Sequence, residues 1–356
     1  MTTSLQTAET DFLLRIQKTG ALKSPVIRAE RVGGGGNSRV FKAQCADGRE
    51  YCVKFYFSSP HDTRDRLGTE YGALKFIYDQ GIHGVPQPVF IDRRALMGVY
   101  EWVNGQKATM QTIVADDIQA AIEFLGQLEG LAHHPKAGQF NTASAGCFCV
   151  KDILNHIETK LQKFHSCPTD TEEFKGLRSY LDKDFLPLFE EILSWVKVNL
   201  GDISFDQGLE RELRTLSPSD FGFHNALREG NGQIKFVDFE YFGWDDPAKM
   251  IVDFIFHPAM NLGFGLKHSF YQQMLLVFKH DVSLKNRVAC YYPLLGLLWC
   301  LIFLNEFIKH DLERRKFAMV DVKDTAFLQQ KQLKKAQDLL AQIKHSYKRF
   351  PYENHS

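Results

Sequence analysis

The sequence predicts an α+β fold in which a small antiparallel sheet precedes a larger helical part. Strand-like segments separated by turn residues fill residues 26–100, and apolar residues recur at helical spacing from about residue 106 onward. A short hairpin near residue 230 interrupts the helical part. The 356 residues, of which 44% are apolar and 24% charged, are enough to bury a core, and the composition is that of an ordinary globular protein.

The first part of the chain carries five segments with strand patterns. They are Val26–Val32, Val40–Gln44, Tyr51–Phe57, Val89–Asp92 and Leu96–Tyr100. Asp47-Gly48 is typical of a hairpin turn between the second and the third. A helix is predicted between the third and the fourth, because apolar residues recur at helical spacing before Gly81. Those residues are Leu67, Tyr71, Leu74 and Ile77.

Four consecutive glycines, followed by Asn37 and Ser38, separate the first two strands. Backbone N–H groups of glycine approach an anion closely because no Cβ intervenes, although flexible turns use the same residues. The third strand then carries Lys54, and Glu70 follows on the predicted helix. Lys54 is either a solvent-facing residue of an edge strand or a buried cation. Glu70 is either its partner or a residue of the solvent face.

A second stretch, Leu216–Pro247, places polar residues on both sides of the hairpin. Ala226–Glu229 and Ile234–Phe239 have strand patterns, and Gly230-Asn231-Gly232 supplies the turn. Asp220 and Asn225 precede the first strand, while Asp238 lies at the end of the second. Phosphoryl transfer needs a loop aspartate for the hydroxyl proton, with an asparagine and a strand-end aspartate for Mg²⁺. The alternative is an ordinary acidic hairpin.

These residues in this order resemble the aminoglycoside phosphotransferase/choline kinase family. The resemblance rests on Asp220-x4-Asn225, on Asp238 and on Gly-x-x-Asp246-Pro247, and it covers roughly residues 24–260. It implies a protein-kinase-like two-lobed fold, with a small antiparallel-sheet N-lobe and a large, mostly helical C-lobe. Asp220-Phe221-Gly222 also spells the metal-binding triplet of protein kinases. Because it lies in a loop before the hairpin, we assign the metal-binding aspartate to Asp238 instead.

The resemblance implies a role for each of these residues. Asp220 is the catalytic residue that orients the acceptor hydroxyl and takes its proton, and Asn225 and Asp238 hold Mg²⁺. The nucleotide is ATP, with GTP as the alternative. Its binding residues are Gly34, Gly35, Gly36, Asn37, Ser38, Lys54, Glu70, Glu101 and Val103. The last two belong to the hinge, where backbone groups contact the base and Tyr100 lines the pocket.

The sequence departs from the family pattern near Asp220 and after the hairpin. The family commonly has His-Gly before the aspartate, a histidine two residues after it, and an aspartate shortly after the Asp-Pro pair. The residues at these positions are Pro218, Ser219, Gly222 and Met250. His224 and Asp253 are candidates to compensate. Glu240, two residues after Asp238, is either a residue that reaches the metal or substrate or a surface carboxylate.

We predict three parts in the chain: an N-terminal extension at residues 1–23, an N-lobe at 24–105 and a C-lobe at 106–350. A helix is predicted within residues 4–19 of the extension. The 17-residue uncharged run Val288–Leu304 is predicted to be a buried helix of the C-lobe, because Pro293 and Gly296 interrupt it and it is barely long enough to span a membrane. An amphipathic helix follows Asp324.

The expected activity is transfer of the γ-phosphoryl group of ATP to a hydroxyl of a small molecule, such as a sugar or an amino alcohol. Equal numbers of basic and acidic residues, 43 each, argue against a nucleic-acid or membrane partner and against an aminoglycoside acceptor. Seven scattered cysteines and a polar N-terminus favour the cytoplasm. The alternatives are a catalytically impaired nucleotide-binding regulatory module and, less favoured because it leaves Asp220 without a purpose, a nucleotidyl transferase.

Overall fold

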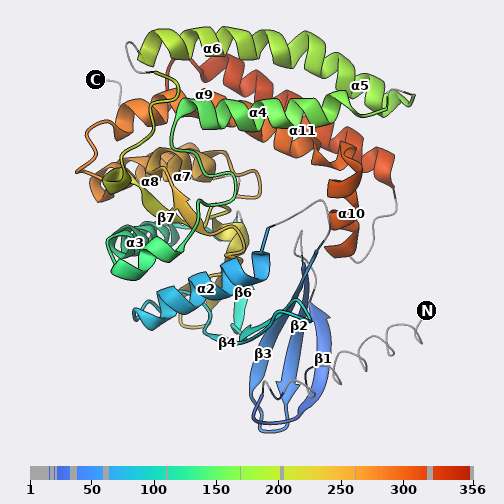
Figure 1. Cartoon of the computed structure of the whole chain (residues 1–356), viewed down its shortest axis with the longest axis vertical. Helices are drawn as coiled ribbons and strands as arrows, with labels where there is room; N and C mark the ends of the chain where they lie inside the picture. The colour runs from blue at the N-terminus through green and yellow to red at the C-terminus, as the bar shows by residue number, and fades with distance from the viewer. Residues whose placement is uncertain are drawn as a thin grey trace. The chain divides into compact units, whose positions relative to one another are not determined.

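The computed structural model describes the chain outside residues 1–15, 17–19, 21, 33–37, 59–63, 110, 169, 201–203, 261, 319–323 and 353–356. The helix predicted within residues 4–19 therefore lies almost wholly outside the described residues. The described residues form two compact units (Figure 1). Unit 1 draws on Met1–Lys107, Asn225–Tyr241 and Glu313–Val322. Unit 2 draws on Ala108–His224, Phe242–Leu312 and Lys323–Ser356.

Unit 1 contains a five-stranded antiparallel sheet with the order β1-β2-β3-β5-β4. Its strands are β1 (Val26–Val32), β2 (Ser38–Cys45), β3 (Glu50–Tyr56), β4 (Pro88–Asp92) and β5 (Met97–Glu101). Each agrees with a predicted segment to within two residues. The middle strand is β3, which pairs with β2 on one side and with β5 on the other. Residues Tyr51–Phe55 of β3, Lys54 among them, therefore lie between two neighbouring strands.

Alternation along β3 sends neighbouring side chains to opposite faces of the sheet. Val53 belongs to an apolar cluster with Ala43, Met97 and Val99, all of them buried. Helix α2 (Arg66–Asp79) packs against β4 and β5 and contributes further buried residues to unit 1. The side chain of Asp65 caps it by accepting a hydrogen bond from the N–H of Gly68 (2.9 Å).

The hairpin belongs to unit 1 although it lies more than 100 residues beyond the sheet in sequence. β8 (Ala226–Glu229) pairs with β9 (Ile234–Phe236) and with β6 (Gly105–Lys107), which is a strand where helix was predicted. β9 stops at Phe236 rather than at Phe239, because Asp238 has a φ of +71° and leaves the extended conformation. Of the predicted turn residues, Gly232 has the positive φ, +86°.

Unit 2 is mainly helical. Its helices are α3 (Ala115–Ala132), α4 (Val150–His165), α5 (Glu172–Tyr180), α6 (Leu186–Leu200), α7 (Pro247–Phe256), α8 (Phe264–Val277), α9 (Leu284–Phe303) and α11 (Thr325–Ser346). Short helical turns lie at Pro135–Gln139, Leu181–Phe185, Arg211–Leu213, Phe223–Asn225 and Leu304–Phe307. Helix α10 (Lys309–Ala318) contains the sequence boundary between the units at Leu312 and Glu313.

Helix α9 forms the centre of unit 2. It packs against α4, α6, α7 and α11, and the long helices run alongside one another in Figure 1. The stretch Leu284–Phe307 is long and apolar enough to cross a membrane by length and composition, but 72% of its most apolar window is buried within the protein. The prediction that Val288–Leu304 forms a buried helix is therefore confirmed.

A two-stranded sheet positions the loop that carries Asp220. β7 (Thr215–Ser217) pairs antiparallel with β10 (Gly243–Asp245), so Ser217, at the end of one strand, lies opposite Gly243, at the start of the other. Helix α7 begins directly after β10 with Asp246 as its N-cap and Pro247 in its first turn. Asp246 also binds the guanidinium of Arg287 through both of its oxygens (2.9 and 3.0 Å).

Candidate functional site

Lys54 is buried at the centre of the five-stranded sheet, on the face opposite Val53. Its side chain is 8% exposed, and its Nζ lies 2.7 Å from Oε2 of Glu70 and in direct ionic contact with Asp238. Burial alone would lower the pKa of Lys54, but the surrounding carboxylates raise it well above its usual value. The edge-strand alternative for Lys54 is wrong, because β3 is the middle strand.

Glu70 is buried on α2, which excludes the solvent-face alternative. Its Oε2 accepts hydrogen bonds from Nζ of Lys54 and from the hydroxyl of Tyr56 (2.6 Å). The Tyr56 oxygen in turn lies 2.8 Å from the hydroxyl of Tyr100, which donates to it because the Tyr56 proton points to Glu70. Burial and repulsion by Asp238 raise the pKa of Glu70 despite Lys54. The pair is therefore held by a buried polar network.

Asp238 and Glu240 approach this network from the segment after β9. Glu240 is not a surface carboxylate: its side chain is 1% exposed, and its oxygens lie 3.6 Å from Nε of Arg66 and 3.9 Å from Nζ of Lys54. Burial, with repulsion by Asp238, raises the pKa of Glu240 to about 7. Oxygens of Glu70, Asp238 and Glu240 lie within 4.8 Å of one another. No pattern in the sequence predicted that Arg66 lies next to Glu240.

Some of the other residues predicted to bind nucleotide or metal lie outside the described residues, and the others can be placed. Gly34, Gly35, Gly36 and Asn37 lie outside the described residues, whereas Ser38 is buried at the start of β2. Asn225 ends a short helical turn, and its carbonyl accepts the N–H of Val237 (2.9 Å), which ties the two sides of the hairpin together.

The two predicted hinge residues, Glu101 and Val103, lie at the end of β5 and just beyond it. The side chain of Glu101 binds Nζ of Lys235 (2.7 Å) and accepts the N–H of Gln87 (3.0 Å). Its own N–H donates to the carbonyl of Gln87 (2.8 Å), and Val103 is buried. The Glu101 side chain thus stabilises the end of the sheet.

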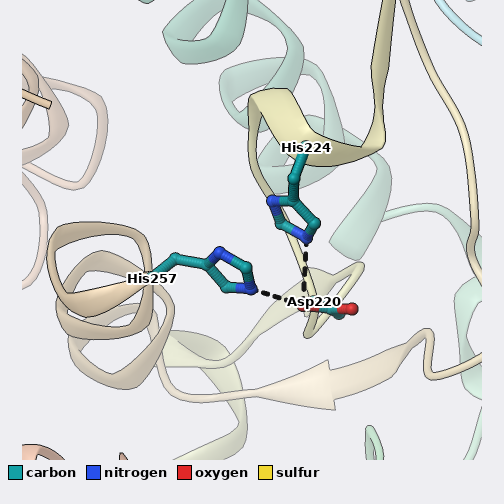
Figure 2. Close-up of side chains that lie close together, drawn as sticks. All are labelled: Asp220, His224 and His257. Atoms are coloured by element: carbon teal, nitrogen blue, oxygen red, sulfur yellow. Dashed lines mark hydrogen bonds and ion pairs between the residues drawn. The ribbon is translucent and has the colours of Figure 1, made fainter. Parts of the chain in front are cut away.

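A second cluster, in unit 2, surrounds Asp220. Nε2 of His224 lies 3.2 Å and Nε2 of His257 lies 3.0 Å from the same oxygen, Oδ1 of Asp220. Figure 2 shows the two rings directed at this carboxylate from different elements, the short turn Phe223–Asn225 and the end of α7. The rings stack with their centroids 3.7 Å apart and their planes 5° from parallel.

The two histidines change the electrostatics of Asp220. Burial alone would raise the pKa of Asp220, but the hydrogen bonds from His224 and His257 hold it below the usual range. Burial lowers the pKa of His257, against the opposing effect of Asp220. The cluster is therefore an ionised carboxylate that accepts hydrogen bonds, with His257 favoured in its neutral form.

The departures from the family pattern at Ser219 and Gly222 have local structural reasons. Ser219 adopts a φ of +67° and ties the loop down, because its Oγ donates to the carbonyl of Ser144 (2.8 Å). A Cβ at Gly222 would lie 3.0 Å from Nδ1 of His224 and closer still to Sδ of Met260. A histidine at position 222 would therefore displace His224.

His257 was missed by the sequence reasoning. It lies 37 residues after Asp220, and no local spacing connects the two. The signal available was indirect, since the Asp246-Pro247 motif starts a helix whose far end delivers His257. One turn before His257, on α7, Asp253 accepts hydrogen bonds from Nζ of Lys249 (2.6 Å) and from Nε1 of Trp299 (2.9 Å).

Comparison with known proteins gives a family match and a set of similar folds. A model of the phosphotransferase enzyme family matches residues 28–254. No curated protein matches the sequence significantly.

Three solved structures illustrate the similar folds. A spectinomycin phosphotransferase in complex with ADP and spectinomycin is 13% identical, with a TM-score of 0.58, over 87% of this chain and 94% of that one. A choline kinase from Streptococcus pneumoniae is 15% identical, with a TM-score of 0.55, over 92% and 98% of the two chains. A Plasmodium vivax ethanolamine kinase is 14% identical, with a TM-score of 0.56, over 89% and 83%. These likenesses confirm the predicted two-lobed fold class.

Proposed function

The chain belongs to the phosphotransferase enzyme family, as the sequence resemblance predicted, and from this premise we propose that it transfers the γ-phosphoryl group of ATP to a hydroxyl of a small molecule. The observation that carries the proposal is the buried cation Lys54, held between Glu70 and Asp238. A buried ammonium is costly unless carboxylates surround it, and a strand lysine paired with a helix glutamate is the device that orients nucleotide phosphates in kinases.

Asp238 and Asn225 are proposed to hold Mg²⁺. Carboxylate and amide oxygens are the hard ligands that Mg²⁺ prefers. Asp238 also lies among buried carboxylate oxygens, within 4.8 Å of oxygens of Glu70 and Glu240, which suits a divalent cation. When bound, magnesium and ATP supply the transferable phosphoryl group and neutralise its charge. The ammonium of Lys54 offsets the negative charge of Asp238.

Asp220 is proposed to act on the acceptor. Its carboxylate is ionised, because hydrogen bonds from His224 and His257 keep its pKa low, and an ionised carboxylate accepts a hydrogen bond from a substrate hydroxyl. An ionised carboxylate orients the hydroxyl, and it is proposed to take the proton late in the transfer. Glu101 and Val103 are proposed to offer backbone groups to the base, and Ser38 with the preceding glycines to contact the phosphates.

The acceptor is proposed to be a sugar, an amino alcohol or a similar metabolite. The similar structures include proteins named for spectinomycin, choline and ethanolamine, each of which carries a hydroxyl. The balance of 43 basic and 43 acidic residues disfavours a polycationic aminoglycoside. A screen of hydroxylated metabolites by coupled release of ADP identifies the acceptor, with water as the background reaction.

Two variants test the proposed roles. Asp220→Asn keeps shape and removes the base, so turnover should fall by about two to four decades while ATP affinity, measured calorimetrically with Mg²⁺, stays within a few fold. Asp238→Ala should abolish Mg²⁺-dependent turnover. Loss of ATP affinity in Asp220→Asn would mean that Asp220-Phe221-Gly222 binds the metal after all. A wild type that binds ATP but transfers phosphate to no acceptor and not to water is a regulatory module.

A further inference from the structure

The two hydrogen bonds to Oδ1 of Asp220 determine which ring nitrogen of each histidine carries a hydrogen. A carboxylate oxygen only accepts, so each Nε2 that points at it carries the proton. A neutral imidazole then has a bare Nδ1. In His257 this atom accepts the N–H of Ala259 (3.4 Å). In His224 it is buried, with no hydrogen-bond partner among the described residues. Both surroundings suit the tautomer with hydrogen on Nε2.

The same three side chains also resemble a metal site. One ligand atom from each of Asp220, His224 and His257 lies within 4.8 Å of the others, and two histidines with a carboxylate bind zinc and iron in many proteins. The ring geometry argues against it. The rings are parallel to within 5° and 3.7 Å apart, so no single ion lies in the plane of both, as the in-plane lone pairs of Nε2 require.

The surroundings of His257 argue against a metal as well. A histidine that binds metal through Nε2 donates its other N–H to an acceptor. Nδ1 of His257 instead faces a donor, the N–H of Ala259. Hydrogen bonding to Asp220 therefore accounts for both nitrogens of this ring, whereas metal binding at Nε2 would put a hydrogen on Nδ1, facing the N–H of Ala259.

We propose that His257 and His224 are positioning residues that clamp the carboxylate of Asp220 for phosphoryl transfer. This inference rests on the proposed role of Asp220 toward the acceptor hydroxyl. The torsion that turns an aspartate carboxylate is soft and roughly two-fold. Two donors on one oxygen restrict that rotation, and with it the direction in which Oδ2 points. Small errors in the placement of a reacting group cost up to about 100-fold in rate.

The clamp is itself held by a chain of contacts within unit 2. The ring of Trp299 packs edge-on against His257 with centroids 5.1 Å apart and planes at 83°. Nε1 of Trp299 donates to Asp253 (2.9 Å), whose other oxygen binds Lys249 (2.6 Å). His257 thus has a fixed position beside the loop of Asp220, and His224 is fixed by stacking on His257. The chain has no histidine at positions 218 and 222, and His224 and His257 supply the two donors to Asp220.

Nuclear magnetic resonance on ¹⁵N-histidine-labelled protein tests the hydrogen bonds without any assay of activity. His224 and His257 are assigned by their single replacements. We expect both to show the tautomer with hydrogen on Nε2 in the wild type, and both signals to shift in Asp220→Asn. A proton on Nδ1 of either ring, or spectra that do not respond to Asp220→Asn, would overturn the clamp.

Kinetics then test the positioning role. His257→Phe keeps a flat ring against Trp299 but removes the donor, and we expect kcat to fall about 10-fold to 100-fold, with KM for ATP within about two-fold. His257→Gln retains an N–H donor and should recover most of that loss, which a purely structural effect would not do. The matched control is His133→Phe, which replaces an exposed histidine paired with Glu129 and should behave as wild type.

The outcomes distinguish the positioning role of the histidines from the proposed function. Wild-type kcat in His257→Phe overturns the positioning role and leaves the proposed function intact. A wild type that transfers no phosphate overturns both, even if the spectra show the hydrogen bonds. Tight Zn²⁺ binding that is lost in His257→Phe and kept in His133→Phe would assign the cluster to a metal and overturn the clamp.

Discussion

At the scale of single residues, the two aspartates differ in what surrounds them. Asp238 contacts a cation, Lys54, whereas Asp220 is bound by two histidines, one of which, His257, is favoured in its neutral form. Mg²⁺ binds carboxylate oxygens, and the carboxylate of Asp238 already contacts one cation, so it lies where positive charge is stabilised. A neutral donor such as His257 leaves the negative charge on the carboxylate, as a group that attracts a hydroxyl proton requires. These surroundings support assigning the metal to Asp238 and the acceptor to Asp220.

Lys54→Met tests whether Lys54 orients the nucleotide. Methionine has a similar length but no charge, so kcat/KM for ATP should fall about 100-fold or more while the protein stays folded. Glu70, whose pKa burial already raises, is expected to gain a proton once the cation is gone, so thermal unfolding should show a larger loss of stability at pH 8 than at pH 6. Coupled ADP release and thermal unfolding measure both effects.

The control is Lys42→Met, which removes a more exposed lysine of the same sheet, paired with Glu50 at 2.8 Å. It should keep normal turnover and show little change in stability. If Lys54→Met melts normally and retains full phosphoryl transfer, Lys54 does not orient the nucleotide.

Lys54 and Glu70 were predictable because each depends on a local pattern. Alternation along one strand predicted that Lys54 lies on the opposite face of the sheet from Val53, and helical spacing placed Glu70 on the following helix. Arg66 and His257 were not predictable in this way, because their partners lie far away in sequence. Burial of Glu240 also depends on the turn after β9, which strand alternation does not describe.

At the scale of secondary-structure elements, the strands of the main sheet were predicted to within two residues, whereas β9 was predicted too long and the short strands β6, β7 and β10 were not predicted. The five strands of the main sheet follow from alternation and turn residues. β9 ends early because of the backbone at Asp238, whose positive φ is unusual for a residue other than glycine. β6 is too short to carry a pattern of its own, and it is a strand because β8 pairs with it.

The packing of α9 makes an element-scale prediction. A Cβ at Gly296 would lie 2.7 Å from Cδ1 of Ile343 on α11 and 2.9 Å from Cζ of Phe256 on α7. Gly296→Ala should therefore destabilise the protein by about 1–3 kcal/mol through overpacking, even though alanine favours helix. Urea unfolding measures the change.

Gly126→Ala on α3 is the matched control, because the nearest atoms to its added Cβ belong to Val277 at ordinary distances of 3.8 and 3.9 Å. It should be neutral or stabilise the protein by up to about 1 kcal/mol. Equal effects of the two substitutions would contradict the close packing of α9 against α7 and α11.

At the scale of the whole molecule, chain order and compact units do not coincide. The segment Asn225–Tyr241 belongs to unit 1, although unit 2 supplies the residues on either side of it. Asn225 and Asp238, the residues proposed to hold the metal, therefore belong to the unit of Lys54, and Asp220 belongs to the other. The predicted C-lobe at residues 106–350 includes this hairpin, because no local sequence pattern shows that it groups with an earlier part of the chain.

Stability of the whole protein in mild acid should reflect two opposing titrations in unit 2. Burial lowers the pKa of His257 in the folded protein. The pKa of a histidine in the unfolded chain is about 6.5, so on acidification the unfolded chain takes up the proton first. Stability therefore falls as the pH drops below about 6.5. Burial raises the pKa of Asp245 to about 6, against about 3.9 when unfolded. As the pH rises, the folded chain keeps the Asp245 proton to a higher pH than the unfolded chain does. The contribution of Asp245 to stability is therefore present in acid and is lost as the pH rises through about 6.

Removing each group should therefore change the pH dependence in opposite directions. His257→Gln should weaken the loss of stability on acidification below pH 6.5. Asp245→Asn, next to Lys249, should strengthen it by removing the opposing titration. Either change approaches about 1.4 kcal/mol per pH unit within its window, because one proton is involved. Urea unfolding between pH 4.5 and 7.5 measures the slopes, and His133→Gln controls for loss of an exposed histidine. If both variants keep the wild-type slope, neither buried group sets the acid response, and exposed carboxylates must account for it.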